Sequence, residues 1–479
     1  MPTRPPLDAR TARWLPWVIA IAFFMQSLDG TILNTALPAM ARDLSENPLR
    51  MQSVVIAYML TVALLIPASG WIADRFGTRK VFFSAILLFS LGSLLCAVSQ
   101  TLGMLVVSRV VQGLGGALMI PVGRLVVLRA YPRSELVRIM GFITIPGLLG
   151  PLLGPTTGGW MVEYMSWHWI FLINLPVGML GCWAIWHFVP DLRGTERTRF
   201  DGIGFVLFGA AMVLITVAME GLGELHLPHL RVMLLLFGGM ACLAAYWLRA
   251  GHIDNPLFSP ALFRTRSFAV GILGNLFARL GSGALPFLVP LLLQVALGHS
   301  PFEAGMSMLP LAASAMVAKS LARPLIERLG YRKVLTANTL LLGVLLASLG
   351  LVSPETPYWL LLVQLGLLGA VNSLQFTAMN TVTLIDLNDA DASSGNSLLS
   401  VVAQLSLSLG VACAGALLGG FTAAGEGDGV STLLGAFQLT FLTIGIMAML
   451  AAGIFVQLPS QHGRRVGRQP PAPMDTPEA

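Results

Sequence analysis

The chain has 479 residues, of which 55% are hydrophobic and 11% are charged, and its mean hydropathy is +0.77. A soluble domain carries about 25% charged residues, so this composition excludes a water-soluble protein built around one buried core. A lipid bilayer supplies the apolar surroundings that such a chain needs. The net charge of +6 comes from short basic clusters between apolar runs, which is typical of membrane topology, so we expect no nucleic-acid partner.

Fourteen apolar runs are long enough to cross a bilayer, since a helical span needs about 20 mostly apolar residues. They are predicted at residues 15–38, 51–73, 81–99, 102–124, 139–162, 170–190, 202–221, 230–250, 268–297, 303–323, 334–352, 357–386, 396–421 and 433–457. The run ending near residue 386 is overlong, which leaves its end open. The first run could be mistaken for a signal peptide, but its length and Asp29 predict a retained span.

The distribution of lysine and arginine predicts the orientation of the spans. If both termini are cytoplasmic, 22 of the 29 basic residues fall in cytoplasmic segments, 3 on the opposite side and 4 within spans. Cytoplasmic loops carry an excess of basic residues. We therefore expect a multi-pass protein of a bacterial inner membrane, with the N- and C-termini in the cytoplasm. One predicted cytoplasmic loop, near residues 386–392, carries acids only.

A short pattern occurs once in each half of the chain. Residues 70–80 and residues 323–333 each place an acid, a base, a glycine and then two bases near a predicted cytoplasmic turn. Transporter folds are commonly built from repeated halves. We predict an all-α membrane protein with a six-helix N-terminal half over 1–190, an inserted pair of helices with a linker over 191–266, a six-helix C-terminal half over 267–457 and a disordered tail over 458–479.

Five segments, taken together and in this order, carry a family resemblance. They are Leu28 to Pro38, Gly70 to Lys80, Arg109 to Gly113, Gly150 to Gly159 and Trp167 to Pro176. Over nearly its whole length the chain resembles the major facilitator superfamily, in its fourteen-helix drug:proton antiporter branch. The resemblance implies the major facilitator fold, with two inserted helices, and a proton-coupled exporter of small molecules that acts in multidrug efflux.

Asp29 is the candidate proton carrier. A carboxylate deep in a span costs about 2.5–3.5 kcal/mol to insert, and burial favours the neutral form that a reversible proton carrier needs. Arg109 is expected at a similar depth, and the resemblance assigns it a role in proton coupling, in which a fixed cation biases the acid towards releasing its proton. The alternatives are a purely structural ion pair and an arginine bonded to backbone carbonyls.

The turn between the second and third spans carries a charged cluster that the resemblance makes a cytoplasmic gate. The cluster consists of Asp74, Arg75, Gly77, Arg79 and Lys80. An excess of cytoplasmic bases explains the basic residues but requires neither the acid nor the glycine. In the C-terminal copy Glu327 replaces the aspartate and the leading glycine is absent, so we expect a weaker contact there.

Glycine and proline recur in the fifth predicted span. The residues are Gly150, Pro151, Gly154, Pro155, Gly158 and Gly159. Glycines four residues apart share a helix face and let a second helix approach closely, while prolines weaken neighbouring backbone hydrogen bonds. The resemblance implies an exporter motif that seals or pivots the two halves. Close packing of helices without that role is the alternative.

Other polar residues in the spans are candidates for a substrate cavity. They are Asn34, Gln112, Asn275, Arg279, Gln375 and Asn380. For the amides of the C-terminal half, contacts between helices are the alternative. Arg279 lies near the middle of a span rich in glycine and proline, whose backbone can bend around it. Lys319 lies nearer the cytoplasmic end of its span, where we expect it to snorkel.

The charged residues expected near the middle of the membrane leave the charge of the substrate open. That balance is one acid, Asp29, against two bases, Arg109 and Arg279. Cationic drugs favour buried acids, so an exporter of an anionic metabolite, such as a carboxylate or its metal chelate, is an alternative to multidrug efflux. A membrane scaffold or sensor without transport is a third.

The sequence carries no catalytic or nucleotide-binding signature. It has no HExxH, GxSxG or P-loop motif, and its four cysteines lie in separate apolar runs without metal-ligand spacing. We therefore expect no enzyme, no metal and no cofactor, with a proton gradient supplying the energy. The expected partners are a small-molecule substrate, protons and the lipid bilayer, and the expected state is a monomer.

Overall fold

The computed structural model describes residues 8–193, 200–223, 229–424 and 430–459. Over these residues the regular structure is entirely helical, and fourteen helical segments are long and apolar enough to cross a membrane. This confirms the predicted number of spans, and their ends agree to within about two helical turns. The overlong run ends at Leu384. The predicted tail from residue 460 onward, the loop at 425–429 and Arg4, Arg197 and Arg199 lie outside the described residues.

The described helices fall into three groups along the chain. The N-terminal half comprises α1 (Ala9–Ile32), η1 (Leu33–Thr35), α2 (Leu37–Asp43), η2 (Pro48–Met51), α3 (Gln52–Phe76), α4 (Thr78–Ala97), α5 (Leu102–Ala130), α6 (Arg133–Tyr164), α7 (Trp169–Leu172) and α8 (Asn174–Phe188). The inserted pair is α9 (Gly202–Gly223) and α10 (His229–Ala250). The linker after this pair holds η3 (Pro260–Arg264). The C-terminal half comprises α11 (Arg266–Leu291), η4 (Leu292–Ala296), α12 (Pro301–Ser307), α13 (Leu309–Leu329), α14 (Tyr331–Ser348), η5 (Leu349–Leu351), α15 (Tyr358–Leu384), α16 (Asp389–Ala424) and α17 (Val430–Phe455).

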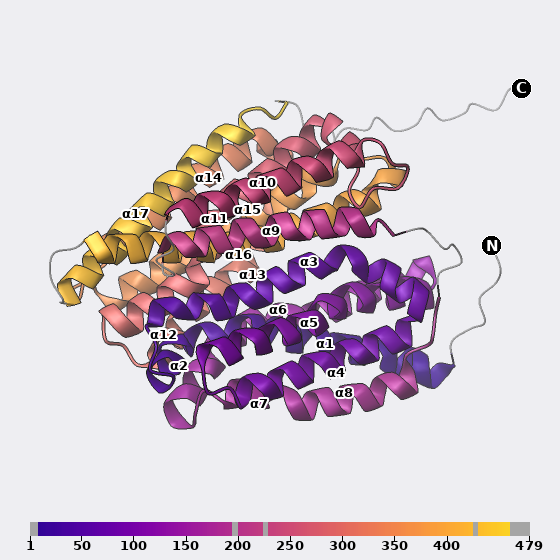
Figure 1. Ribbon diagram of the computed structural model, residues 1–479, viewed down its shortest axis with the longest axis horizontal. Helices are drawn as coiled ribbons and strands as arrows, with labels where there is room; N and C mark the ends of the chain where they lie inside the picture. The colour runs from indigo at the N-terminus through magenta and orange to yellow at the C-terminus, as the bar shows by residue number, and fades with distance from the viewer. Residues whose placement is uncertain (1–7, 194–199, 224–228, 425–429, 460–479) are drawn as a thin grey trace, which may run out of the picture.

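The long helices run back and forth along the long axis, and the N-terminal half lies beside the C-terminal half (Figure 1). The helix α1 begins and α17 ends at the same end of the bundle, which we call the termini end, and we call the other the far end. The inserted helices pack against each other, and α9 lies along α16 and also touches α3. The inserted pair therefore lies at the seam between the halves.

The buried apolar side chains show where the two halves meet. At the far end one continuous cluster joins residues of both halves, such as Leu33 and Phe171 on one side and Phe287 and Leu292 on the other. Towards the termini end each half also has its own cluster, and a further cluster joins Leu60 of α3 to the inserted pair and to α11 and α16. Burial of apolar surface is the main force that holds packed elements together. The core that the two halves share directly therefore lies mainly at the far end, and the inserted pair contributes to a second junction between them.

Candidate functional site

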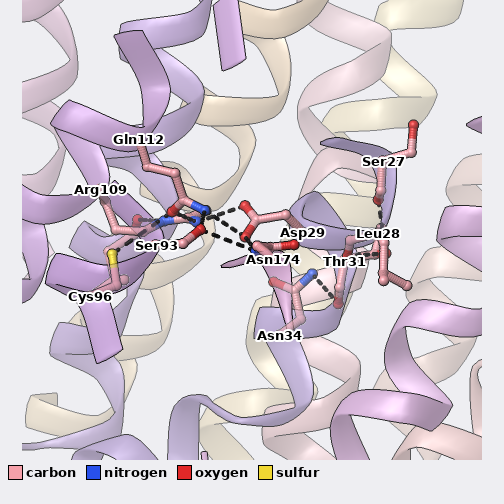
Figure 2. A network of polar contacts seen from close by, with 11 residues as sticks. Ser27, Leu28, Asp29, Thr31, Asn34, Ser93, Cys96, Arg109, Gln112 and Asn174 are labelled. Atoms are coloured by element: carbon pink, nitrogen blue, oxygen red, sulfur yellow. Dashed lines mark hydrogen bonds and ion pairs between the residues drawn. The ribbon is translucent and has the colours of Figure 1, made fainter. Parts of the chain in front are cut away.

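A buried ion pair lies inside the N-terminal half (Figure 2). Arg109 Nη1 donates to Asp29 Oδ2 at 2.8 Å, and each side chain is at most 2% exposed. Gln112 Nε2 donates to Asp29 Oδ1 at 2.7 Å, while Gln112 Oε1 accepts from Arg109 Nη1 at 2.6 Å. The three side chains thus form a closed ring, which brings together the two residues predicted to couple protons. A buried charge needs such compensation, because losing hydration costs several kcal/mol per ion.

Two further residues, which were not predicted as site residues from the sequence, complete this network. Asn174 Nδ2 donates to Asp29 Oδ1 at 3.2 Å and to Ser93 Oγ at 3.1 Å, and Ser93 Oγ also accepts from Gln112 Nε2 at 2.7 Å. Asn174 lies in the matched segment 167–176, so a signal for it was present. In the sequence Ser93 is one small residue of an apolar span, and its place in the network is seen only from its hydrogen bonds to Gln112 and Asn174.

The guanidinium of Arg109 is enclosed on its other sides. Its Nε donates to the backbone oxygen of Val54 at 3.4 Å, and its Cζ lies 4.2 Å from the ring centre of Tyr58 and 6.0 Å from that of Phe171. Aromatic rings attract cations through their negative faces. The positive charge is therefore held by a carboxylate, an amide, a carbonyl and aromatic rings together.

Glycines on α4 and α5 allow these side chains to meet. A Cβ atom at Gly92 would lie 2.4 Å from the Gln112 Cα, and one at Gly115 would lie 2.4 Å from the Ala85 backbone oxygen. Real Cβ atoms do not approach backbone so closely, so α4 and α5 pack at a separation that only glycine permits. The close approach brings Gln112 within reach of Ser93.

Three of the exporter-motif glycines lie against α1, inside the N-terminal half. They are Gly150, Gly154 and Gly158. A Cβ atom at any of them would lie between 2.2 and 2.6 Å from atoms of α1 or η1. In addition, Thr31 Oγ1 donates to the Gly150 backbone oxygen and Thr35 Oγ1 to that of Pro155, each at 3.3 Å. This face of α6 therefore packs on the helix that carries Asp29.

The glycine and proline motif of α6 contacts the C-terminal half through its last residues, near Gly159. A Cβ atom at Gly159 would lie 2.2 Å from the Pro301 backbone oxygen of α12, and one at Gly305 would lie 2.3 Å from that of Pro155. Thr156 Oγ1 also donates to the Gly305 backbone oxygen at 3.4 Å. A reciprocal pair of glycines thus lets α6 and α12 touch at the far end.

The charged cluster near the α3–α4 turn makes its contacts within the N-terminal half. Asp74 forms an ion pair with Arg129 at the end of α5, and Arg79 Nε donates to the Val189 backbone oxygen at 2.5 Å. The Arg75 guanidinium lies over rings of its own helix, and Lys80 is exposed. The structure therefore brings this cluster together with α5 and with the segment after α8, at the termini end.

A glycine with positive φ occupies the corresponding turn of each half. Gly77 has φ +92° and Gly330 has φ +80°, a backbone conformation that side chains other than glycine rarely adopt. A Cβ atom at Gly77 would also lie 2.2 Å from Asp191 Oδ1. In the C-terminal copy the acid has a different kind of partner. Glu327 accepts a hydrogen bond from Arg323 of its own helix at 2.8 Å, and both side chains are exposed.

A cavity of about 300 Å³ lies between the two halves. It is lined by Thr31, Asn34, Leu148, Pro151, Pro155, Pro286, Pro290, Met308, Leu311, Ala312, Ala315, Met316, Lys319, Asn372, Ser373 and Phe376. Apolar residues predominate, as is usual for small-molecule sites. Its one charged lining residue is Lys319, which we expected to snorkel.

Of the six predicted cavity residues, Asn34 lines this cavity and the other amides lie elsewhere. Gln112 belongs to the Asp29 network, and Gln375 bonds Asn338 and Thr339 of α14 at 2.8 and 2.7 Å. Their amides bond neighbouring helices of the same half, which for Gln375 is the alternative that the sequence left open.

Asn275 and Asn380 also lie outside the cavity wall. Asn275 Nδ2 donates to the Gly271 backbone oxygen at 3.0 Å, one turn back on its own helix. The side-chain oxygens of both residues are buried without a hydrogen-bond partner in the described part of the chain.

Arg279 lies directly behind the cavity wall. Its guanidinium is 4.3 Å from the ring centre of Phe376, which lines the cavity, and the residue is 8% exposed. Its Nη1 has no hydrogen-bond partner among the described residues. Among the described residues, the structure shows no hydrogen bond from this guanidinium to a helix carbonyl.

Repeated helical halves around an apolar cavity define a multi-pass membrane transporter. The model of the Major Facilitator Superfamily matches residues 19–248 and 271–476. The fold is similar to the crystal structure of a bacterial homologue of the human lysosomal transporter Spinster, with a TM-score of 0.67 and 16% identity over 97% of this chain and 100% of that one.

Two relatives named "Putative multidrug resistance protein MdtD" are similar over nearly their whole length. The one from Pectobacterium atrosepticum is 49% identical over 94% of this chain and 96% of its own. The one from Serratia proteamaculans is 49% identical over 94% of each chain. The chain therefore belongs to the major facilitator superfamily.

Proposed function

We propose that this protein is a proton-coupled exporter that exchanges protons for lipophilic drugs. The observation that carries the proposal is the buried Asp29–Arg109 ion pair. When Asp29 takes up a proton, its carboxyl group no longer attracts Arg109 as an anion, and the hydrogen bonds around it must rearrange. A proton therefore changes the packing of α1 against α5.

The helix α1 connects this ion pair to the substrate cavity. Asp29 points into the N-terminal half, whereas Thr31 and Asn34, less than two turns further along, line the cavity. A movement of α1 that follows protonation changes the cavity wall as well. This shared helix is a physical route by which proton binding and substrate binding exclude each other, which antiport requires.

The cavity and the relatives support drugs as substrates. The lining is rich in proline, leucine and methionine, and methionine adapts to ligands of varied shape. The relatives at 49% identity carry the name of multidrug resistance proteins.

Transport in proteoliposomes tests the proposed function. An imposed pH gradient should drive a lipophilic dye across the membrane against its own gradient, and a protonophore should stop it. Transport that ignores the pH gradient would contradict proton coupling. A protein that moves neither dye nor protons would instead be a scaffold or sensor.

An anionic substrate is the second candidate, favoured by Lys319 as the one charged residue in the cavity wall. A charge-assisted hydrogen bond is worth about 1.5–3 kcal/mol, so Lys319→Gln should raise the KM for an exported organic anion about 10–100-fold. Lys319→Arg keeps the charge and is the matched control. Arg279→Gln, which removes a charge behind the wall, should weaken anion export less. Unchanged anion export by Lys319→Gln, with normal export of cationic dyes, leaves multidrug efflux as the function.

We also propose that the termini end faces the cytoplasm of a bacterial inner membrane. The support is the predicted 22-to-3 asymmetry of basic residues. A reporter active only in the cytoplasm should be active when fused after Gln457 and silent when inserted at 425–430. The reverse pattern would refute the orientation.

In this orientation the core that the halves share directly lies mainly on the side away from the cytoplasm. The cluster of Asp74, Arg75, Gly77, Arg79 and Lys80 would then form the proposed gate when the halves close, and the α6–α12 contact would form the seal on the opposite side. We further propose that the monomer is the transporting unit, because the cavity is formed by one chain.

A further inference from the structure

A second cavity, of about 390 Å³, lies at the far end of the bundle between the inserted helix α9 and the N-terminal half. It is lined by Glu46, Arg50, Gln52, Ser53, Leu102, Gly103, Val106, Val217 and Glu220. Arg50 Nη1 donates to Glu46 Oε2 at 2.6 Å, and these two side chains are 45% and 25% exposed. The cavity therefore reaches the surface beside this ion pair.

Glu220 brings a carboxyl group from α9 into this cavity. Its Oε1 is buried without a hydrogen-bond partner among the described residues. The same holds for Oε1 of Gln52, a residue that is 1% exposed. The Ser53 hydroxyl has one proton to donate, either to the Glu220 carboxylate or to the Arg50 backbone oxygen, which lies 2.9 Å away. The cavity wall thus presents buried acceptor oxygens that lack donors, which is a rare arrangement in a native interior.

The described groups around Glu220 offer its carboxylate the Ser53 hydroxyl but no unpaired cation. From η2 and the residues before it come Arg50 and Glu46, which pair with each other. The helix α5 contributes Leu102, Gly103 and Val106, and α9 itself contributes Val217, none of which carries a charge. Arg231 of the neighbouring helix α10 does not line the cavity. An ionised acid in such surroundings is expensive, and a bound proton both neutralises it and supplies a missing donor.

The floor of this cavity adjoins the Asp29–Arg109 pair. Val106, in the cavity wall, precedes Arg109 by three residues on α5 and so lies about one turn from it. On α3, Ser53 is followed by Val54, whose backbone oxygen accepts from Arg109 Nε at 3.4 Å. The helices α3 and α5 thus contribute both to this cavity and to the surroundings of the Asp29–Arg109 pair.

We propose that Glu220 binds a proton from the solution at the far end and passes it towards Asp29. In the first step a hydrated proton forms an O–H bond on the Glu220 carboxylate. In the second step that bond breaks as an O–H bond forms on Asp29, through water that the cavity is large enough to hold. Arg109 keeps its charge throughout. This inference rests on the proposed proton coupling, and it gives the inserted helices a part in it.

Infrared titration of the purified full chain tests the proton binding directly, whether or not transport is measured. The carbonyl-stretch band of a protonated carboxyl group should titrate in the wild type and in Asp29→Asn, and part of it should be absent from Glu220→Gln. Glu355→Gln removes an exposed acid at the same end of the bundle and is the matched control. A Glu220→Gln spectrum that titrates as the control does would overturn the proposal.

Proteoliposomes test the transfer towards Asp29. Export by Glu220→Gln should slow several-fold and lose its dependence on the pH at the far end, while its dependence on the pH at the termini end stays. Glu220→Asp, which keeps the acid, should recover most of the rate. If Glu220→Gln exports at the wild-type rate at every pH on the far side, the proposed proton transfer from Glu220 to Asp29 is wrong. Normal gradient-driven export by Asp29→Asn would instead refute the proposed function, and the infrared band would still decide whether Glu220 binds a proton.

Discussion

We expect the Asp29→Asn variant to reach the membrane folded and to lose all export driven by a pH gradient. Asparagine has the shape of aspartate, but its one amide oxygen replaces only one carboxylate oxygen, so it keeps either the bond from Arg109 or the bonds from Gln112 and Asn174. It cannot take up or release a proton, so the change that we assign to protonation no longer occurs. Binding of substrate to the cavity should persist, because Asp29 does not line it.

The measurement is uptake of dye into proteoliposomes with and without a pH gradient, together with dye binding to the purified variant. Asp29→Glu, which keeps a titratable acid, is the matched control and should retain part of the export. Full gradient-driven export by Asp29→Asn would show that the ion pair is structural. Loss of dye binding as well would show that the variant is misfolded or that the cavity depends on Asp29.

Replacing Arg109 by leucine should destabilise the protein strongly. The substitution leaves Asp29 buried with only the amides of Gln112 and Asn174 as donors. Breaking a buried ion pair by removing one partner costs about 3–5 kcal/mol, because the remaining charge is uncompensated. We therefore expect a large fall in the free energy of unfolding in detergent, and a poor yield of folded protein.

The double variant Asp29→Asn/Arg109→Leu separates the lost charge pair from the lost packing. It carries no uncompensated charge at this position, so it should be less destabilised than the sum of the two single variants. Equilibrium unfolding of the four proteins gives the coupling energy of the pair. Strictly additive effects would mean that Asp29 and Arg109 do not stabilise each other.

The sequence predicted the position of each span and the two charged partners of the buried site. Hydrophobicity along a single chain is enough to find helices that cross a bilayer, because every span must satisfy the same length and polarity. The depth of Asp29 and Arg109 followed from counting residues along their helices. The structure confirms the fourteen spans among its described residues and places the two side chains 2.8 Å apart.

Counting residues gives the depth of a side chain but not the direction in which it points. Gln112 and Gln375 lie at suitable depths for a cavity, yet each turns towards a neighbouring helix of its own half. Lys319, which was expected to snorkel, is among the residues that line the cavity. Asn174, predicted only as part of a matched segment, turns towards Asp29.

The sequence by itself thus determined the number of spans, the family and the presence of a deep acid and a deep base. Only the tertiary structure decided which polar side chains meet, which of them line the cavity and that Glu220 lies beside a second one. The rotation of each helix about its axis depends on packing against several neighbours that are distant in sequence. Contacts such as that of Gly92 with Gln112 fix this rotation, and they exist only once the helices are assembled.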